Sequence, residues 1–260
     1  MIDALAAEWL KLRTLRSTSV VLAVVAVVVA LMALLAWWSA NLWDGLSPGD
    51  RDHLVVSPLP DVTHMLASLC LAVLGVLAFS GEQGTGMIRT TFTVLPSRGR
   101  VLAAKAGVVA AVAACTGLTA VLATYAAGRL LIGDRPIRGQ SAEVLSRQLP
   151  HFLAMSLSIT MFALLGLCLA VITRSAVAAI ATLVAVWYVL PIVGYNLPAP
   201  WGDRVGSILP GALADQLAGT GNPDAVTVAL LPPLAALAVM AAYVAVPYGV
   251  AAVLLARRDP

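Results

Sequence analysis

Residues 17–43, STSVVLAVVAVVVALMALLAWWSANLW, contain no aspartate, glutamate, lysine or arginine. A helix of about 20 residues crosses the hydrocarbon core of a bilayer, so this run is long enough to span a membrane. Its apolar residues are continuous and do not alternate with polar ones, as they would in the strand of an outer-membrane barrel. The stretch therefore predicts a transmembrane helix.

Five further runs without acidic or basic residues follow it. They cover residues 62–81, 106–128, 148–173, 175–202 and 225–256. The composition agrees, because 60% of the chain is hydrophobic and only 11% is charged, against about a quarter charged in soluble domains. We predict an all-α membrane protein whose six transmembrane helices occupy residues 17–256.

The distribution of basic residues predicts the orientation of these helices, because short loops rich in lysine and arginine tend to stay in the cytoplasm. Six crossings place both termini and segment 81–105 on one side, and ten of the sixteen basic residues fall there. We expect that side to be cytoplasmic, in a multi-pass protein of the inner membrane. Four arginines on the other side argue against this orientation: Arg129, Arg135, Arg138 and Arg147.

Residues 1–16 precede the first span and have an amphipathic pattern. Apolar side chains recur at helical spacing, at Ile2, Leu5, Trp9 and Leu12. Basic residues, Lys11 and Arg13, lie on other faces. Such a segment is typical of a helix lying in the membrane interface, with Trp9 among the lipid headgroups. The alternative is a solvated leader.

Motifs of catalysis and nucleotide binding do not occur in the sequence. Neither lysine, Lys11 or Lys105, is followed by serine or threonine, as a phosphate-binding P-loop requires. Gly81, Gly84 and Gly86 are spaced GxxGxG and not GxGxxG. The three histidines have no HExxH spacing, and there is no GxSxG elbow. We expect no enzyme activity, no cofactor, no metal site and no nucleic-acid partner.

Segment 79–105, FSGEQGTGMIRTTFTVLPSRGRVLAAK, separates two apolar runs and is rich in glycine and basic residues. Together with the opening EWLKLRTLRS at 8–17, it resembles the integral-membrane permease of ABC-2 type transporters. The resemblance covers essentially the full length, with six helices and an interfacial helix before them. It implies a separate ATP-binding subunit in two copies, and a second permease copy or a homologous permease.

The resemblance also implies a role for segment 81–105, as the cytoplasmic coupling loop. In this family the loop carries a short coupling helix that docks on the ATP-binding subunit. The residues expected to contact that subunit are Glu82, Gly86, Met87, Ile88, Arg89, Thr90 and Phe92. Arg98, Arg100 and Lys105 would then anchor the third membrane helix at the lipid headgroups. The alternative is an ordinary basic loop, which leaves the glycines and apolar residues unexplained.

Two other segments bear on transport. Residues 197–223 are too polar for a seventh span, and they resemble the re-entrant or surface segment that this family places between its last two membrane helices. Pro191 interrupts the fifth span, and Pro232, Pro233 and Pro247 interrupt the last. Proline leaves a helical carbonyl unpaired and permits a bend.

With this resemblance, the sequence predicts the permease subunit of an ATP-driven transporter. The resemblance implies an exporter, and the expected substrate is a lipid, a peptide or a hydrophobic small molecule. ATP hydrolysis is expected in the partner subunit. Two alternatives stay open. One is a self-contained ion- or proton-coupled carrier, and the other is a membrane scaffold or immunity protein without transport.

Overall fold

The structure is a computed structural model that describes residues 2–84, 98–140, 143–198, 200–219 and 231–257. The first half of the chain forms α1 (Ile2–Thr14), α2 (Arg16–Gly45), α3 (Pro48–Arg51), α4 (Leu59–Gly84) and α6 (Arg98–Ile132). The second half forms α7 (Leu145–Thr173), α8 (Ala176–Val184), α9 (Leu190–Tyr195), α10 (Trp201–Ile208), α11 (Leu213–Ala218) and α12 (Pro233–Arg257). Among these residues the only β-type pairing is a single bridge between Val55 and Arg138.

In the described ranges, six helical segments are long and apolar enough to cross a membrane. They correspond one to one to the six uncharged runs of the sequence, so the predicted all-α fold with six spans is confirmed. The fifth is composite, because α8 continues through a π-helical turn at Ala185–Val189 into α9. Pro191 lies just after that turn and has no N–H for the carbonyl of Trp187, four residues earlier. A widened turn accommodates the missing hydrogen bond.

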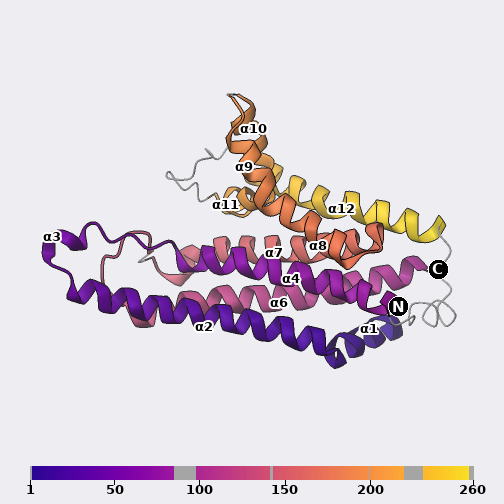
Figure 1. Cartoon of the computed structure of the whole chain (residues 1–260), viewed down its shortest axis with the longest axis horizontal. Coiled ribbons are helices and arrows are strands. Elements are labelled where there is room, and N and C mark those ends of the chain that lie inside the picture. Colours follow the sequence, from indigo (N-terminus) through magenta and orange to yellow (C-terminus); the bar gives the residue numbers. More distant parts are fainter. Residues whose placement is uncertain (1, 85–97, 141–142, 199, 220–230, 258–260) are drawn as a thin grey trace.

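Helix α7 is the centre of the bundle. It packs against α4 and α6 on one side and against α8, α11 and α12 on the other, while α2 covers α4 and α6 (Figure 1). Phe152, Met155, Ile159, Phe162 and Leu167 of α7 are almost completely buried. In contrast, α2 and α12 expose many of their apolar side chains, as helices at the edge of a membrane bundle do.

Helices α4 and α7 approach each other closely because each carries a glycine at their crossing. A Cβ at Gly75 would collide with the carbonyl oxygen of Ala163, and a Cβ at Gly166 would collide with that of Ala72. Small residues at such crossings let helix backbones approach in a membrane. The contacts also fix the register, in which the two helices run in the same direction.

The two ends of the bundle differ in what they carry. Helix α1, the last turn of α4, the first turn of α6 and the end of α12 lie at one end, which we call the proximal end (Figure 1, right). Helix α3 and the start of α7 lie toward the opposite, distal end. There, Gln140 donates hydrogen bonds to the carbonyl oxygens of Val56 and Ser57, at 3.2 and 2.9 Å.

The segment 197–223, expected to be re-entrant or superficial, is described up to Gly219. It consists of α10, a 3₁₀ turn at Pro210–Ala212 and α11. Leu209 and Leu213 are buried, whereas Trp201 and Ile208 are exposed. Because α11 packs against α7 and α12, this part of the segment is anchored to the bundle.

Candidate functional site

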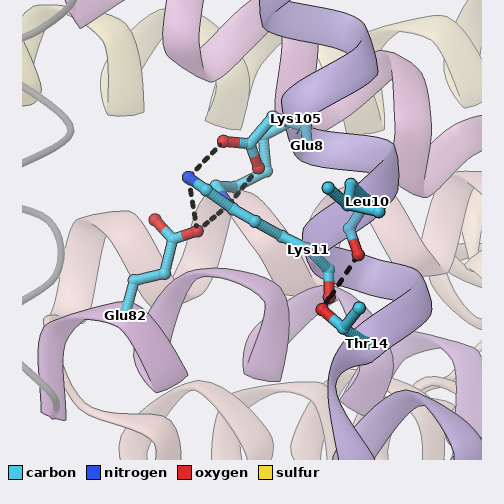
Figure 2. Close-up of polar contacts among 6 residues, drawn as sticks. All are labelled: Glu8, Leu10, Lys11, Thr14, Glu82 and Lys105. Carbon is cyan, nitrogen blue, oxygen red and sulfur yellow. Dashed lines mark hydrogen bonds and ion pairs between the residues drawn. The ribbon is translucent and has the colours of Figure 1, made fainter.

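Four charged side chains from three helices meet at the proximal end of the bundle (Figure 2). Glu8 and Lys11 belong to α1, Glu82 to the last turn of α4, and Lys105 to the second turn of α6. We call these four residues the charge cluster. Glu82 and Lys105 flank the connection between α4 and α6, so the cluster joins both ends of that connection to α1.

Each lysine of the charge cluster donates hydrogen bonds to both glutamates. Lys105 Nζ lies 2.6 Å from Glu8 Oε2 and 2.8 Å from Glu82 Oε1. Lys11 Nζ lies 2.8 Å from Glu8 Oε1 and 3.2 Å from Glu82 Oε1. Two positive and two negative groups therefore alternate around a closed ring with no formal net charge.

The charge cluster is largely shielded from solvent. The side chains of Glu8, Glu82 and Lys105 are each 5% exposed, and that of Lys11 is 24% exposed. Removing one partner of a buried ion pair typically costs about 3–5 kcal/mol, because an uncompensated charge stays behind. Loss of any one of the four charges should therefore destabilise this end of the bundle.

The two charge-cluster residues on α1, Glu8 and Lys11, have shifted pKa values in this environment. Burial by itself raises the pKa of Glu8, but the charge of Lys105 and the hydrogen bonds from Lys105 and Lys11 outweigh it and leave that pKa below its ordinary value of 4.5. Burial lowers the pKa of Lys11, yet the hydrogen bond and charge of Glu8, followed by those of Glu82, raise it above 10.5. Both groups are therefore charged across the neutral range.

Helix α1 docks on the bundle through a mixed face and not through a purely apolar one. Ala4, Glu8 and Leu12 are its buried residues, and Leu5 packs against Gly107 of α6. Trp9 is 51% exposed, so it does not share the buried face with Leu5 and Leu12 as its spacing suggested. Arg13 is exposed as well. The outward direction of Trp9 is compatible with a place among lipid headgroups.

Most residues expected in the coupling helix lie outside the described part of the chain. They are Gly86, Met87, Ile88, Arg89, Thr90 and Phe92. Glu82 lies within the described part of the chain, in the last turn of α4, which ends at Gly84. Its carboxylate points into the charge cluster (Figure 2). The role of these residues in binding an ATP-binding subunit stays a prediction.

The expectation that Lys105 anchors α6 at the lipid headgroups is wrong. Its side chain is buried between α1, α4 and α6, because two carboxylates compensate its charge there. Arg100 is exposed, as expected of a headgroup anchor.

Sequence reasoning missed Glu8 and Lys105 as partners. Two signals were available. Glu8 occurs between Leu5 and Leu12 on one helical face, and Glu82 and Lys105 are opposite charges that flank the two apolar runs around one loop. The structure adds that these positions meet in space.

In the described part of the chain, no group of three or more His, Cys, Asp or Glu residues could hold a metal ion.

A comparison with protein families gives one match that spans most of the chain. The family model described as "ABC-2 family transporter protein" matches residues 4–191. This range includes all four residues of the charge cluster and extends from α1 into α9. No curated protein matches the chain.

Proposed function

The chain belongs to the ABC-2 family of transporter proteins and is a membrane-spanning permease subunit of an ABC transporter, and we propose that it exports a lipid, a peptide or a hydrophobic small molecule. Two copies of an ATP-binding subunit drive export, and a second permease copy or a homologous permease completes the complex. The protein lies in the inner membrane, with both termini in the cytoplasm.

The charge cluster is the observation that carries this proposal. A loop that receives force from an ATPase must have firmly held ends, because a loosely held loop would move without moving the helices behind it. Glu82 and Lys105 hold the ends of the α4–α6 connection to each other at 2.8 Å, and Glu8 and Lys11 fasten α1 to both. A partner that pushes on segment 85–97 would therefore move α4, α6 and α1 together.

In this assignment Glu82 acts as a positioning residue for the loop. The apolar residues Met87, Ile88 and Phe92 contact the ATP-binding subunit, with Gly86, Arg89 and Thr90 beside them. Apolar and aromatic side chains at the centre of a protein interface usually supply most of its affinity.

Reconstituted transport tests this function directly. The cognate ATP-binding subunit is the ABC ATPase that co-purifies with the chain from its own host. In inside-out vesicles containing both, ATP should drive accumulation of a hydrophobic substrate, and a proton gradient alone should drive none. Accumulation driven by the gradient without ATP would instead identify a proton-coupled carrier, in which Glu82→Gln abolishes transport.

A further inference from the structure

A cavity of about 770 Å³ lies at the distal end of the bundle, far along the helices from the charge cluster. Its wall comes from the connection between α3 and α4, the start of α4, the end of α6, the connection between α6 and α7, the start of α7 and one residue of α11. Cavities of about 300–1,000 Å³ commonly hold small organic ligands. This volume is therefore sufficient for a small molecule.

Two carboxylates of the cavity wall lie on either side of an imidazole. His151 Nε2 is 3.5 Å from Asp61 Oδ1, and His151 Nδ1 is 3.8 Å from Asp215 Oδ1. The three residues come from α4, α7 and α11. The side chains of Asp61 and Asp215 are 47% and 44% exposed, whereas that of His151 is 17% exposed. Both carboxylates can therefore reach a ligand in the cavity.

The charges of the wall favour a cation. It carries four carboxylates, Asp61, Asp134, Glu143 and Asp215, and three guanidinium groups, Arg129, Arg135 and Arg147. Arg135 is already neutralised by Asp44, which accepts hydrogen bonds of 2.9 and 2.7 Å from its Nε and Nη2. Apart from Arg135, the wall has four carboxylates against two guanidinium groups, so negative charge is in excess even with His151 protonated.

An aromatic ring adds an apolar surface beside the carboxylates. The half-buried ring of Tyr125 lines the cavity and rests on the buried ring of Phe152, with the two centroids 5.2 Å apart. The hydroxyl of Tyr125 donates a hydrogen bond of 2.9 Å to the carbonyl oxygen of Glu143, which fixes the ring. Aromatic faces together with carboxylates are the usual surroundings of a bound organic ammonium group.

Buried polar groups continue inward from the cavity along α4 and α7. His64 Nε2 and Ser68 Oγ on α4, and Ser158 Oγ on α7, have no hydrogen-bond partner among the described residues. Asp61 and His151, which lie side by side, are 90 residues apart in sequence, and so are Ser68 and Ser158. Because α4 and α7 run in the same direction, Ser68 and Ser158 lie at the same height along the two helices. All three groups are more than nine-tenths buried. Buried polar atoms without partners call for a water or a ligand.

We propose that the distal cavity binds an organic ammonium compound, whose cationic nitrogen pairs with Asp61 and Asp215 and whose apolar part packs on the ring of Tyr125. This inference deepens the proposed transport function, on which it rests for its biological role, by assigning a ligand class to one site in the permease. Binding itself needs neither ATP nor the partner subunit, so its failure is distinguishable from a failure of transport.

The binding should weaken in acid. Burial raises the pKa of Asp215 to about 6, against the opposing charge of His151. Below that pH Asp215 loses its charge, and the cation loses one of its two carboxylate partners. The other charged groups facing Asp215 and His151 are Asp61 from α4, Arg129 from α6, Asp134, Arg135 and Glu143 from the connection, and Arg147 from α7.

Calorimetric titration of the purified chain in neutral-lipid nanodiscs with benzyltrimethylammonium tests the site. Saturable binding at pH 7.5 is expected, with no binding of benzenesulfonate, an anion of similar size. Asp61→Asn and Asp215→Asn should each raise Kd about tenfold or more, the usual effect of losing a charge-assisted contact. Asp203→Asn, in the neighbouring α10 and outside the cavity wall, is the matched control and should leave Kd unchanged.

Thermal melting of each variant verifies that the fold is intact. Asp61→Glu, which keeps the charge, should bind more tightly than Asp61→Asn. Lowering the pH to 5 should raise Kd for the unaltered chain. The ammonium site is overturned by absence of saturable binding, by equal binding of benzenesulfonate, or by folded Asn variants with unchanged Kd.

Discussion

Lys105 Nζ lies 2.6 Å from Glu8 Oε2, across 97 positions of sequence, and both side chains are 5% exposed. This ion pair fastens α1 to α6. Through Lys11 and Glu82 it also fastens α1 to the end of α4. The amino-terminal helix is therefore part of the bundle's proximal end, and it contacts Glu82 and Lys105, which flank segment 85–97.

Removing the charge of Lys105 should destabilise the protein strongly. Lys105→Met leaves Glu8 and Glu82 with Lys11 as the cation they share, and the expected loss is about 3–5 kcal/mol of unfolding free energy. Thermal unfolding in detergent measures this loss. An unchanged melting temperature would show that the charge cluster contributes nothing to stability.

A second substitution distinguishes the loss of charge balance from the loss of packing. Lys105→Met combined with Glu82→Gln restores neutrality and keeps the 2.8 Å pair between Lys11 and Glu8. The double variant should be more stable than Lys105→Met alone, since residues of one network are not additive. Equal or lower stability would mean that Lys105 acts through its packing.

Docking of α1 should depend on pH in a defined direction. The pKa of Glu8 is lowered in the folded state, so its contribution is present above the ordinary value of 4.5 and is lost as the pH falls through the lowered pKa. The pKa of Lys11 is raised, so its contribution is present below 10.5 and is lost as the pH rises through the raised pKa.

A spin label on exposed Ala7 reports this dependence, in a background without the native cysteines. Its mobility should be low at neutral pH and increase as the pH falls below 4.5, through the lowered pKa of Glu8. In the matched variant Glu8→Gln, the acid-induced increase should be smaller. A label that is equally immobile at pH 3 and pH 7 would argue against the ion pairs as the attachment of α1.

The glycine crossing of α4 and α7 should be intolerant of even one methyl group. Gly75→Ala or Gly166→Ala places a Cβ against a backbone carbonyl, and overpacking of this kind typically costs about 1–3 kcal/mol. Gly249→Ala on α12 is the control, because no atom lies within 4 Å of its Cβ. An equal loss of melting temperature in Gly249→Ala and Gly75→Ala would contradict the close approach of α4 and α7.

The sequence was sufficient for the architecture because uncharged runs of more than 20 residues have few alternatives to a membrane helix. It placed six spans and located Pro191 where the fifth span widens. It was insufficient for the charge cluster, because pairing Glu8 with Lys105 requires the tertiary arrangement of α1, α4 and α6. Counting Lys105 as a headgroup anchor followed from its place at a span edge, which does not reveal the two carboxylates beside it.

The exposed face of Trp9 has a similar explanation. Its spacing from Leu5 and Leu12 is helical, yet Glu8 occupies the buried face because Lys105 compensates its charge. Hydrophobic periodicity assigns faces by apolarity alone. The distal cavity was equally invisible, since Asp61, His151 and Asp215 are far apart in sequence and carry no motif.

The proximal and distal ends of the bundle are expected on opposite sides of the membrane. Cysteines at a matched pair of glycine positions can test this. Gly49 in α3 and Gly99 in α6 are both exposed with no atom within 4 Å of an added Cβ. In a background without Cys70, Cys115 and Cys168, Gly49→Cys should react with an impermeant thiol reagent in intact cells. Gly99→Cys should react only after the cells are opened. The reverse pattern would place the termini outside.

The affinity between the purified permease and its ATP-binding subunit tests the central assignment most directly. Ile88→Asp with Phe92→Asp should weaken binding by about thirtyfold or more, because truncating a central contact commonly costs about 2 kcal/mol. Ser97→Asp adds a charge to the same loop, at a position outside the residues expected to contact the ATP-binding subunit, and should bind like the unaltered chain. Full-strength binding of the Ile88→Asp, Phe92→Asp variant would contradict the assignment of this loop as the coupling element.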